Sequence, residues 1–141
     1  MTSISARQHL LLPGPTMVPQ EVLRAVSAEP VNHRGTEFSA LYGEVVDGLR
    51  RLLHTSGEVH LLPGSGTGAM EAAVANLFSP GDRVLVGVMG EFGARFAQIC
   101  SAFGLDVETV EVPWGHAVEP EAIQARLEAD TGRDIKGVVV T

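Results

Sequence analysis

The chain has 141 residues, of which 45% are hydrophobic and 19% charged, and its formal net charge is -7. This length and composition predict one globular domain, and the acidic balance argues against nucleic acid or an anionic membrane surface as the main partner. A single cysteine, Cys100, excludes an internal disulfide framework. With no signal-peptide pattern and no apolar stretch of membrane-spanning length, these features predict a cytoplasmic protein.

The first 35 residues predict an arm and a short helix. Pro13-Gly14-Pro15-Thr16 has the chemistry of a rigid turn. Pro19 suits the start of a short helix that Pro30 stops. Asn32-His33-Arg34-Gly35 then reads as a loop, in which His33 and Arg34 can be ordinary polar loop residues.

Residues 36–54 predict a long amphipathic helix, with Thr36 as a plausible N-cap. Its apolar residues recur at three- and four-residue steps. They are Phe38, Leu41, Tyr42, Val45, Val46, Leu49, Leu52 and Leu53. This stripe favours a core or subunit contact rather than a cofactor contact.

Residues 58–80 predict a strand, a glycine-rich turn and a helix. Val59–Leu62 is the apolar run, 64–68 is the turn GSGTG, and the helix that follows ends at Pro80-Gly81. The first turn of a helix has unpaired N–H groups and a partial positive charge, which suits an anion. The glycine spacing matches neither the dinucleotide fingerprint nor the Walker loop. A glycine-rich helix entry that binds nothing is the alternative.

The remaining residues predict regular alternation. Strands are expected at 83–88, 105–112 and 136–141, the last fully apolar and of the buried kind, and helices at 91–103 and from Pro120 to Gly132. Cys100 lies in mid-helix on an apolar face, which indicates a buried packing residue. Together with the strand at Val59, this order predicts an α/β fold with a mostly parallel sheet flanked by helices. Ligands of such sheets lie beyond the carboxyl ends of the strands, where the glycine turn and the turn at 89–92 are expected.

Other reaction classes lack their motifs. The five histidines show no metal-ligand spacing, so no metal site is predicted. Ser65 lies in Gly-Ser-Gly rather than in the pattern of a nucleophile elbow.

Five segments of this sequence resemble a known family: PGPTMVP, NHRGTEF, LLPGSGTGAMEAAVANL, VGVMGEFGARF and KGVVVT. In this order and spacing they resemble the N-terminal part of class V aminotransferases, which are fold type I enzymes that use pyridoxal 5'-phosphate. The nearest branch is that of the serine–pyruvate and alanine–glyoxylate aminotransferases. The resemblance implies an N-terminal arm and short helix at 1–35, and part of the cofactor-binding large domain at 36–141. It also implies a homodimer that acts on a small amino acid and on pyruvate or glyoxylate.

The resemblance further assigns expected roles to individual residues. Ser65, Gly66 and Thr67 match the turn that holds the cofactor phosphate, and Phe92 matches the aromatic residue that stacks on the pyridine ring, although an apolar helix-face role competes for Phe92. The remaining matches are Gly14, Pro15 and Thr16 near the substrate, and His33 and Arg34 near the active site and the dimer interface.

The catalytic groups of the family are not expected in this chain. Its Schiff-base lysine and the acidic partner of the ring nitrogen lie beyond the position that matches Thr141, so the chain is expected to be cut short and inactive alone. Lys136, the single lysine, is expected at the opposite end of its strand from the cofactor. Two alternatives stay open: another fold type I enzyme, such as a cysteine desulfurase-like lyase, or a non-catalytic α/β module that binds a phosphorylated ligand.

Overall fold

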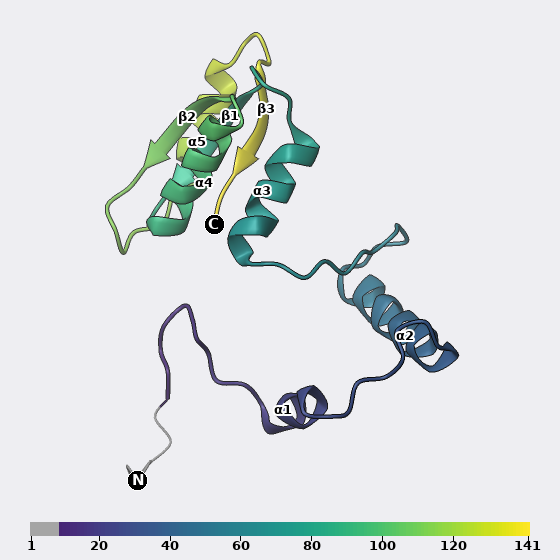
Figure 1. Cartoon of the computed structure of the whole chain (residues 1–141). Helices are drawn as coiled ribbons and strands as arrows, with labels where there is room; N and C mark the ends of the chain where they lie inside the picture. The colour runs from purple at the N-terminus through teal and green to yellow at the C-terminus, as the bar shows by residue number, and fades with distance from the viewer. Residues whose placement is uncertain (1–8) are drawn as a thin grey trace. The chain divides into compact units, whose positions relative to one another are not determined.

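The computed structural model describes residues 9–141, and the chain divides into two compact units between Leu61 and Leu62 (Figure 1). The first unit contains two helices, α1 (Gln20–Val26) and α2 (Thr36–Leu52). Gly35, rather than Thr36, is the N-cap residue of α2, so the predicted side-chain cap is wrong. The helix begins one residue earlier than that cap requires, because Thr36 already has a helical backbone.

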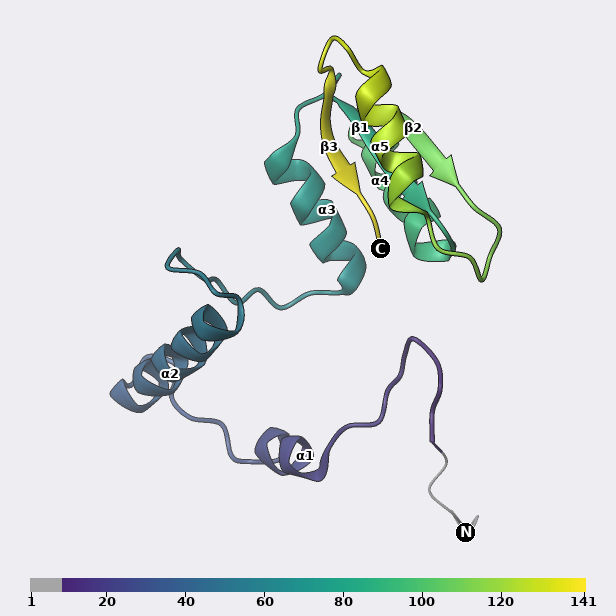
Figure 2. The same ribbon diagram turned by 180° about the vertical axis from the view of Figure 1, so that it is seen from behind.

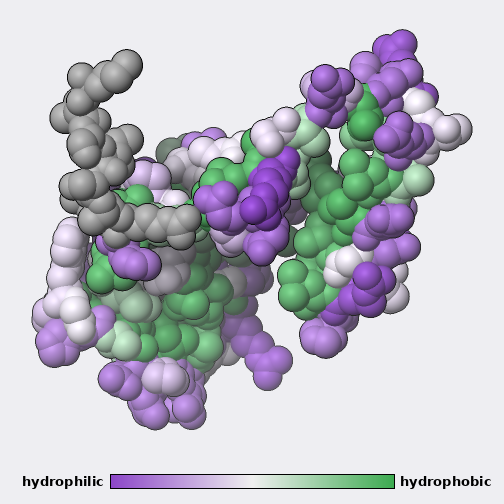
Figure 3. Space-filling view, turned by 90° about the horizontal axis from the view of Figure 1, so that it is seen from below, coloured by the Kyte–Doolittle hydropathy of each residue, from purple (hydrophilic) through white to green (hydrophobic). Residues whose placement is uncertain are grey.

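Most of the apolar stripe on α2 faces solvent. Val46 is its one buried residue, whereas Leu41, Tyr42 and Val45 are exposed. The space-filling view of Figure 3 shows apolar residues, coloured green, at the surface of the described part of the chain. The amphipathic pattern was therefore predicted correctly, but the residues described in this unit leave much of the apolar side uncovered.

The second unit is an α/β layer structure. Its elements are α3 (Gly66–Leu77), β1 (Arg83–Val88), α4 (Glu91–Ala102), β2 (Asp106–Glu111), α5 (Pro120–Ala129) and β3 (Ile135–Val139). The three strands form a parallel sheet in the order β2-β1-β3. Figures 1 and 2 place α4 and α5 on opposite faces of this sheet. The predicted α/β class with a parallel sheet flanked by helices is confirmed.

The core of this unit surrounds β1. Val84 and Val86 are fully buried and pack with Val74 of α3 and with Ile99 and Cys100 of α4. Leu85, also fully buried, alternates to the other face of the sheet. The central strand is buried on both faces because helices cover both, as parallel sheets require. The predicted burial of Cys100 is confirmed.

Gly104 ends α4 as the sequence predicts. It follows the C-cap residue Phe103 with a φ of 80°, a conformation that glycine adopts without steric cost. The chain then turns directly into β2.

Two strand predictions need correction. Val59–Leu62 is not a strand: residues 58–65 have no regular structure, and Leu62 is 82% exposed. A strand requires a hydrogen-bonded neighbour, and the described residues offer this run none. The final strand is not fully buried, since β3 alternates between half-buried and exposed residues, with Val138 exposed. It lies at the edge of the sheet, so β1 covers it on one side only.

Candidate functional site

The start of α3 is held by a side-chain cap. Ser65 has an extended backbone, and its Oγ accepts a hydrogen bond from the N–H of Gly68 at 3.0 Å. The carbonyl oxygen of Ser65 accepts from the N–H of Ala69 at 3.1 Å, which closes the first helical turn. The sequence folds this way because serine at the N-cap satisfies one of the orphan donors of a helix.

The first two N–H groups of α3 remain available. Within residues 9–141, the N–H groups of Gly66 and Thr67 have no hydrogen-bond acceptor. A β-carbon added at Gly64 or Gly66 would meet no atom within 4 Å, so the space in front of these groups is open. The turn borders a hollow of about 530 Å³ whose lining includes Pro63, Gly64, Ser65 and Gly68. Two free donors at a helix start, facing open space, can bind an anion.

A second hollow lies at the carboxyl ends of β1 and β3. Its volume is about 360 Å³, and it is lined by Met70, Met89, Gly90, Glu91, Phe92, Gly93 and Thr141. These residues come from α3, from the turn between β1 and α4, from the first turn of α4, and from Thr141 after β3. The hollow lies beyond the carboxyl ends of the strands, which is where ligands of parallel sheets bind.

Phe92 lines this hollow and is not a core residue. It is 50% exposed, whereas Phe96, one turn later on α4, packs against the core. The adjacent Glu91 pairs with Arg95 at 3.3 Å on the outside of the first turn. The Phe92 ring can therefore present an aromatic face to a planar ligand in the hollow.

The other predicted site residues belong to the first unit and are described within it. Gly14, Pro15 and Thr16 are exposed in and after a bend. His33 and Arg34 are exposed in a turn. Asn32 shapes that turn: its Oδ1 accepts from the N–H of Arg34 at 3.1 Å, and its carbonyl oxygen accepts from the N–H of Gly35 at 2.8 Å.

Lys136 is the second residue of β3, at the amino end of the strand, as the sequence predicts. Thr141, which borders the hollow, follows the other end of the same strand. The five residue steps from one to the other span roughly 16 Å at the usual rise of a strand. The lysine amine and the hollow therefore lie toward opposite ends of the sheet.

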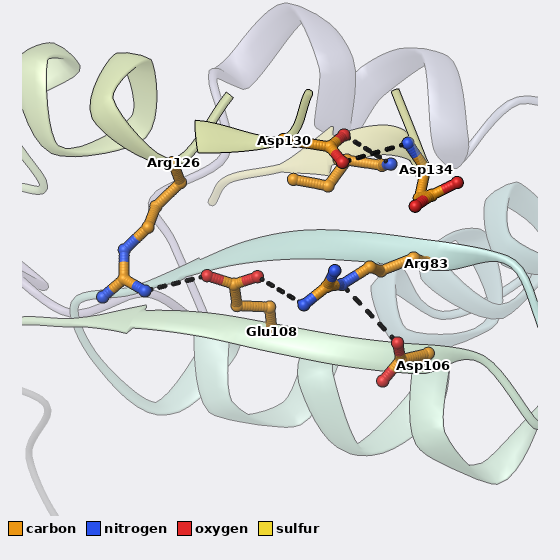
Figure 4. Close-up of polar contacts among 7 residues, drawn as sticks. Arg83, Asp106, Glu108, Arg126, Asp130 and Asp134 are labelled. Carbon is orange, nitrogen blue, oxygen red and sulfur yellow. Dashed lines mark hydrogen bonds and ion pairs between the residues drawn. The ribbon is translucent and has the colours of Figure 1, made fainter. Parts of the chain in front are cut away.

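The sequence did not predict a network of ion pairs at the amino end of the sheet (Figure 4). Glu108 of β2 accepts hydrogen bonds from Arg83 of β1 at 3.1 Å and from Arg126 of α5 at 2.9 Å, and Asp106 lies 3.5 Å from the Nε of Arg83. The acidic alternation in 106–111 signals exposed carboxylates but not their partners. Because these side chains are partly exposed, their ion pairs contribute little to the stability of the fold and mainly hold this end of the sheet in place.

Asp130 fastens the start of β3. Its carboxylate accepts from the N–H of Ile135 at 2.9 Å and from the N–H of Asp134 at 3.1 Å (Figure 4). These two backbone donors lower the pKa of Asp130, because they stabilise its charged form. The contact is structural and lies at the end of the sheet remote from both hollows.

Two further findings bear on the kind of site. No helix in residues 9–141 is long and apolar enough to cross a bilayer. In the same residues, no three His, Cys, Asp or Glu side chains gather as metal ligands would.

Comparison with known proteins finds relatives that the chain matches over part of their length. No protein-family model matches the sequence. Over 94% of its length the chain is 46% identical to the soluble hydrogenase 42 kDa subunit of Anabaena cylindrica. It is 36% identical over 98% of its length to the L-aspartate–glyoxylate aminotransferase of Paracoccus denitrificans, and 36% over 95% to the serine–glyoxylate aminotransferase of Methylorubrum extorquens. It covers 34%, 35% and 34% of these relatives, respectively.

Over nearly its whole length the chain is similar to about a third of the length of proteins named as glyoxylate aminotransferases. Solved structures agree with this similarity. An alanine–glyoxylate aminotransferase from Nostoc sp. matches 92% of the chain with a TM-score of 0.74 and 37% identity. A pyridoxamine–pyruvate aminotransferase from Mesorhizobium loti matches 98% with a TM-score of 0.84 and 28% identity. In both comparisons the chain covers 35% of the solved class V aminotransferase-like chain.

Proposed function

We propose that this chain is the cofactor-gripping part of a pyridoxal 5'-phosphate-dependent aminotransferase, which moves an amino group from a small amino acid to pyruvate or glyoxylate. The observation that carries the proposal is the start of α3, where the N–H groups of Gly66 and Thr67 are unpaired and face open space. The relatives named as aspartate–glyoxylate and serine–glyoxylate aminotransferases support glyoxylate as the keto acid.

Ser65, Gly66 and Thr67 would hold the cofactor phosphate. The two free N–H groups donate to phosphate oxygens, and the partial positive charge of the helix start favours the dianion. The oxygen of Ser65 already accepts from Gly68, so its own hydrogen remains to be donated to the phosphate. The glycine at 66 keeps the approach clear, because it has no side chain in the open space.

Phe92 would cover the pyridine ring from the wall of the second hollow. Its half exposure leaves a ring face free, and offset stacking contributes about 0.5–1.5 kcal/mol beyond area burial. When bound, the cofactor supplies an electron sink for carbanion chemistry. The residues of this chain bind and orient that group.

We also propose roles for residues of the first unit. Gly14, Pro15 and Thr16 are proposed to lie near the substrate, and His33 and Arg34 near the active site and the subunit boundary. In this proposal residues 1–35 form an arm, residues 36–141 form part of the cofactor domain, and the protein is a cytoplasmic homodimer. The uncovered apolar stripe of α2 is consistent with a subunit contact.

This chain is proposed to bind the cofactor without catalysing transamination alone. Its single lysine, Lys136, lies at the amino end of β3, away from the hollow that Phe92 borders. The chain spans about a third of the relatives, so the lysine and the substrate-binding groups of the whole enzyme are assigned to the remaining part.

A hybrid enzyme tests the proposal. The corresponding N-terminal third of the Methylorubrum extorquens serine–glyoxylate aminotransferase is replaced by this chain, and amino transfer from serine to glyoxylate is measured. We expect activity that depends on added cofactor and that falls in a variant with Thr67→Pro, which removes one N–H donor. The control is Ser101→Ala, at an exposed residue of α4. A folded hybrid that retains cofactor but transfers no amino group would contradict the proposal.

A hydrogenase subunit is a second candidate, because two relatives carry that description. To test this, the corresponding third of the Anabaena cylindrica 42 kDa subunit is replaced by this chain, and the hybrid subunit is introduced into cells that lack the natural one. Restored hydrogen uptake that survives Thr67→Pro would favour the hydrogenase role. Conversion of cysteine to alanine by the hybrid, with sulfide released when a thiol reductant is added, would instead favour a cysteine desulfurase-like lyase. Phosphate binding without turnover would favour a binding module.

A further inference from the structure

Gly93 lies where α4 leaves no room for a side chain against the sheet. It is buried in the first turn of α4, directly after Phe92. A β-carbon at this position would lie 2.8 Å from the carbonyl oxygen of Gly87 and 3.1 Å from the Cα of Val88. Both atoms belong to the backbone of β1, which cannot move aside as a flexible side chain can.

The missing β-carbon therefore sets how closely α4 approaches β1. Any other residue would require the first turn to lift by roughly half an ångström before carbon and oxygen reached ordinary van der Waals distance. The far half of the helix is fixed, because Ile99 and Cys100 are buried in the core. The displacement would therefore concentrate at the end that carries Phe92.

The close approach of α4 to β1 at Gly93 controls the shape of the hollow that Phe92 borders. Phe92 and Met89 lie on the β1–α4 side, whereas Met70 comes from α3 and Thr141 follows β3. A lift of the first turn moves the Phe92 ring relative to Met70 and leaves the opposite wall in place. The volume available to a planar ligand between the walls then changes.

We propose that Gly93 is a positioning residue that sets the place of the Phe92 ring over the hollow. It does so through the close approach of its Cα to the carbonyl of Gly87, without contacting the ligand. The ligand-binding consequence rests on the proposed function, in which Phe92 covers the cofactor ring. The geometric part, the place of the ring in the folded chain, can be measured without any ligand.

Gly87 supplies a matched control. It is also buried, and an added β-carbon would meet side-chain atoms at 3.0 Å (Val140 Cγ1) and 3.5 Å (Val118 Cγ2). Those neighbours are side chains away from α4, so Gly87→Ala adds the same methyl group beside the same strand end. The side chains of Val140 and Val118 can shift to accommodate this methyl group without lifting the first turn of α4.

The first experiment reads the ring position by methyl NMR of the full chain labelled at its four methionines. The Phe92 ring current acts on the Met70 and Met89 methyl groups, and Phe92→Leu identifies that effect. We expect Gly93→Ala to shift the Met70 signal and Gly87→Ala to leave it in place. Sucrose keeps the native state populated if Gly93→Ala is unstable, and Gly93→Ser repeats the test. A Met70 signal unmoved by either Gly93 variant would overturn the proposal.

The second experiment titrates the same variants with pyridoxal 5'-phosphate and, separately, with inorganic phosphate. We expect Gly93→Ala to weaken cofactor affinity about 2- to 10-fold, as Phe92→Leu does, with phosphate affinity unchanged. Weakening by Phe92→Leu alone would overturn the role of Gly93 and leave the proposed function standing. If neither variant weakened the cofactor, the ring assignment to Phe92 would fail, and the role of Gly93 in ligand binding with it.

Discussion

The Oγ of Ser65 accepts a hydrogen bond from the N–H of Gly68 at 3.0 Å, and this contact caps α3. Replacing Ser65 by Ala removes the acceptor, so we expect a loss of about 1 kcal/mol in the free energy of unfolding, the usual cost of an N-cap. Urea unfolding of the chain measures it. Ser101→Ala is the control, because the Ser101 hydroxyl donates to the carbonyl of Ala97 within α4 and caps nothing. Equal stability of Ser65→Ala and the unmodified chain would contradict the cap.

Phe92 and Phe96 lie one turn apart on α4 but should differ in their effects. Phe96 packs against the core, so Phe96→Ala is expected to cost about 3 kcal/mol of stability. Phe92 is half exposed, so Phe92→Ala should cost much less. Cofactor affinity should show the reverse order once both variants are compared at equal native fraction. Phe103→Ala, at the other end of α4, is the control for aromatic loss. A larger stability loss from Phe92→Ala than from Phe96→Ala would place Phe92 in the core.

Lys136 should not attach the cofactor covalently. It lies at the amino end of β3, whereas the hollow lies at the carboxyl ends of β1 and β3. We expect borohydride treatment of the chain with pyridoxal 5'-phosphate to reduce the cofactor onto Lys136 no more than onto the N-terminal amine, as intact mass and peptide mapping will report. Lys136→Arg provides the background signal from the N-terminus. Specific reduction onto Lys136 would mean that its strand has been placed in the wrong direction.

The apolar stripe of α2 should mediate self-association. Leu41, Tyr42 and Val45 are exposed on it, and burial of such surface favours association by about 25 cal/mol per Å² before the costs of binding. We expect sedimentation at micromolar concentration to show a dimer that Val45→Asp dissociates. Asp47→Asn, on the same helix, is the control. Dissociation by Val138→Lys instead would assign the association to the open edge of β3.

Asp130 should make the sheet sensitive to acid. Its pKa is lowered in the folded chain by the N–H groups of Ile135 and Asp134, so its stabilising contribution is present above the ordinary carboxyl pKa. That contribution is lost as the pH falls from about 4 through the lowered value. We expect Asp130→Ala to flatten the acid limb of a pH–stability curve. Asp47→Ala, at an exposed carboxylate of the first unit, is the control. An unchanged acid limb in Asp130→Ala would show that other groups govern it.

Local patterns in the sequence were enough to predict the helices. The periodic residues of 36–52 specify a helix because i, i+3 and i+4 positions share one face in any surroundings. The predicted glycine turn at 64–68 lies partly inside α3, which begins at Gly66 because Ser65 caps it through an equally local contact. The resemblance added roles for Ser65, Gly66, Thr67 and Phe92, which remain predictions.

Pairing and burial were decided by the tertiary structure. Val59–Leu62 has the apolar pattern of a strand but finds no strand partner, and the apolar 136–141 segment is half exposed because β3 is an edge. The ion pairs of Glu108 join residues 18 and 25 positions away. No local signal in Gly93 reveals its contact with Gly87. By itself the sequence determined which segments form helices and which side of each is apolar, since those depend on near neighbours. Which face is covered depends on distant segments, and only the folded chain brings them together.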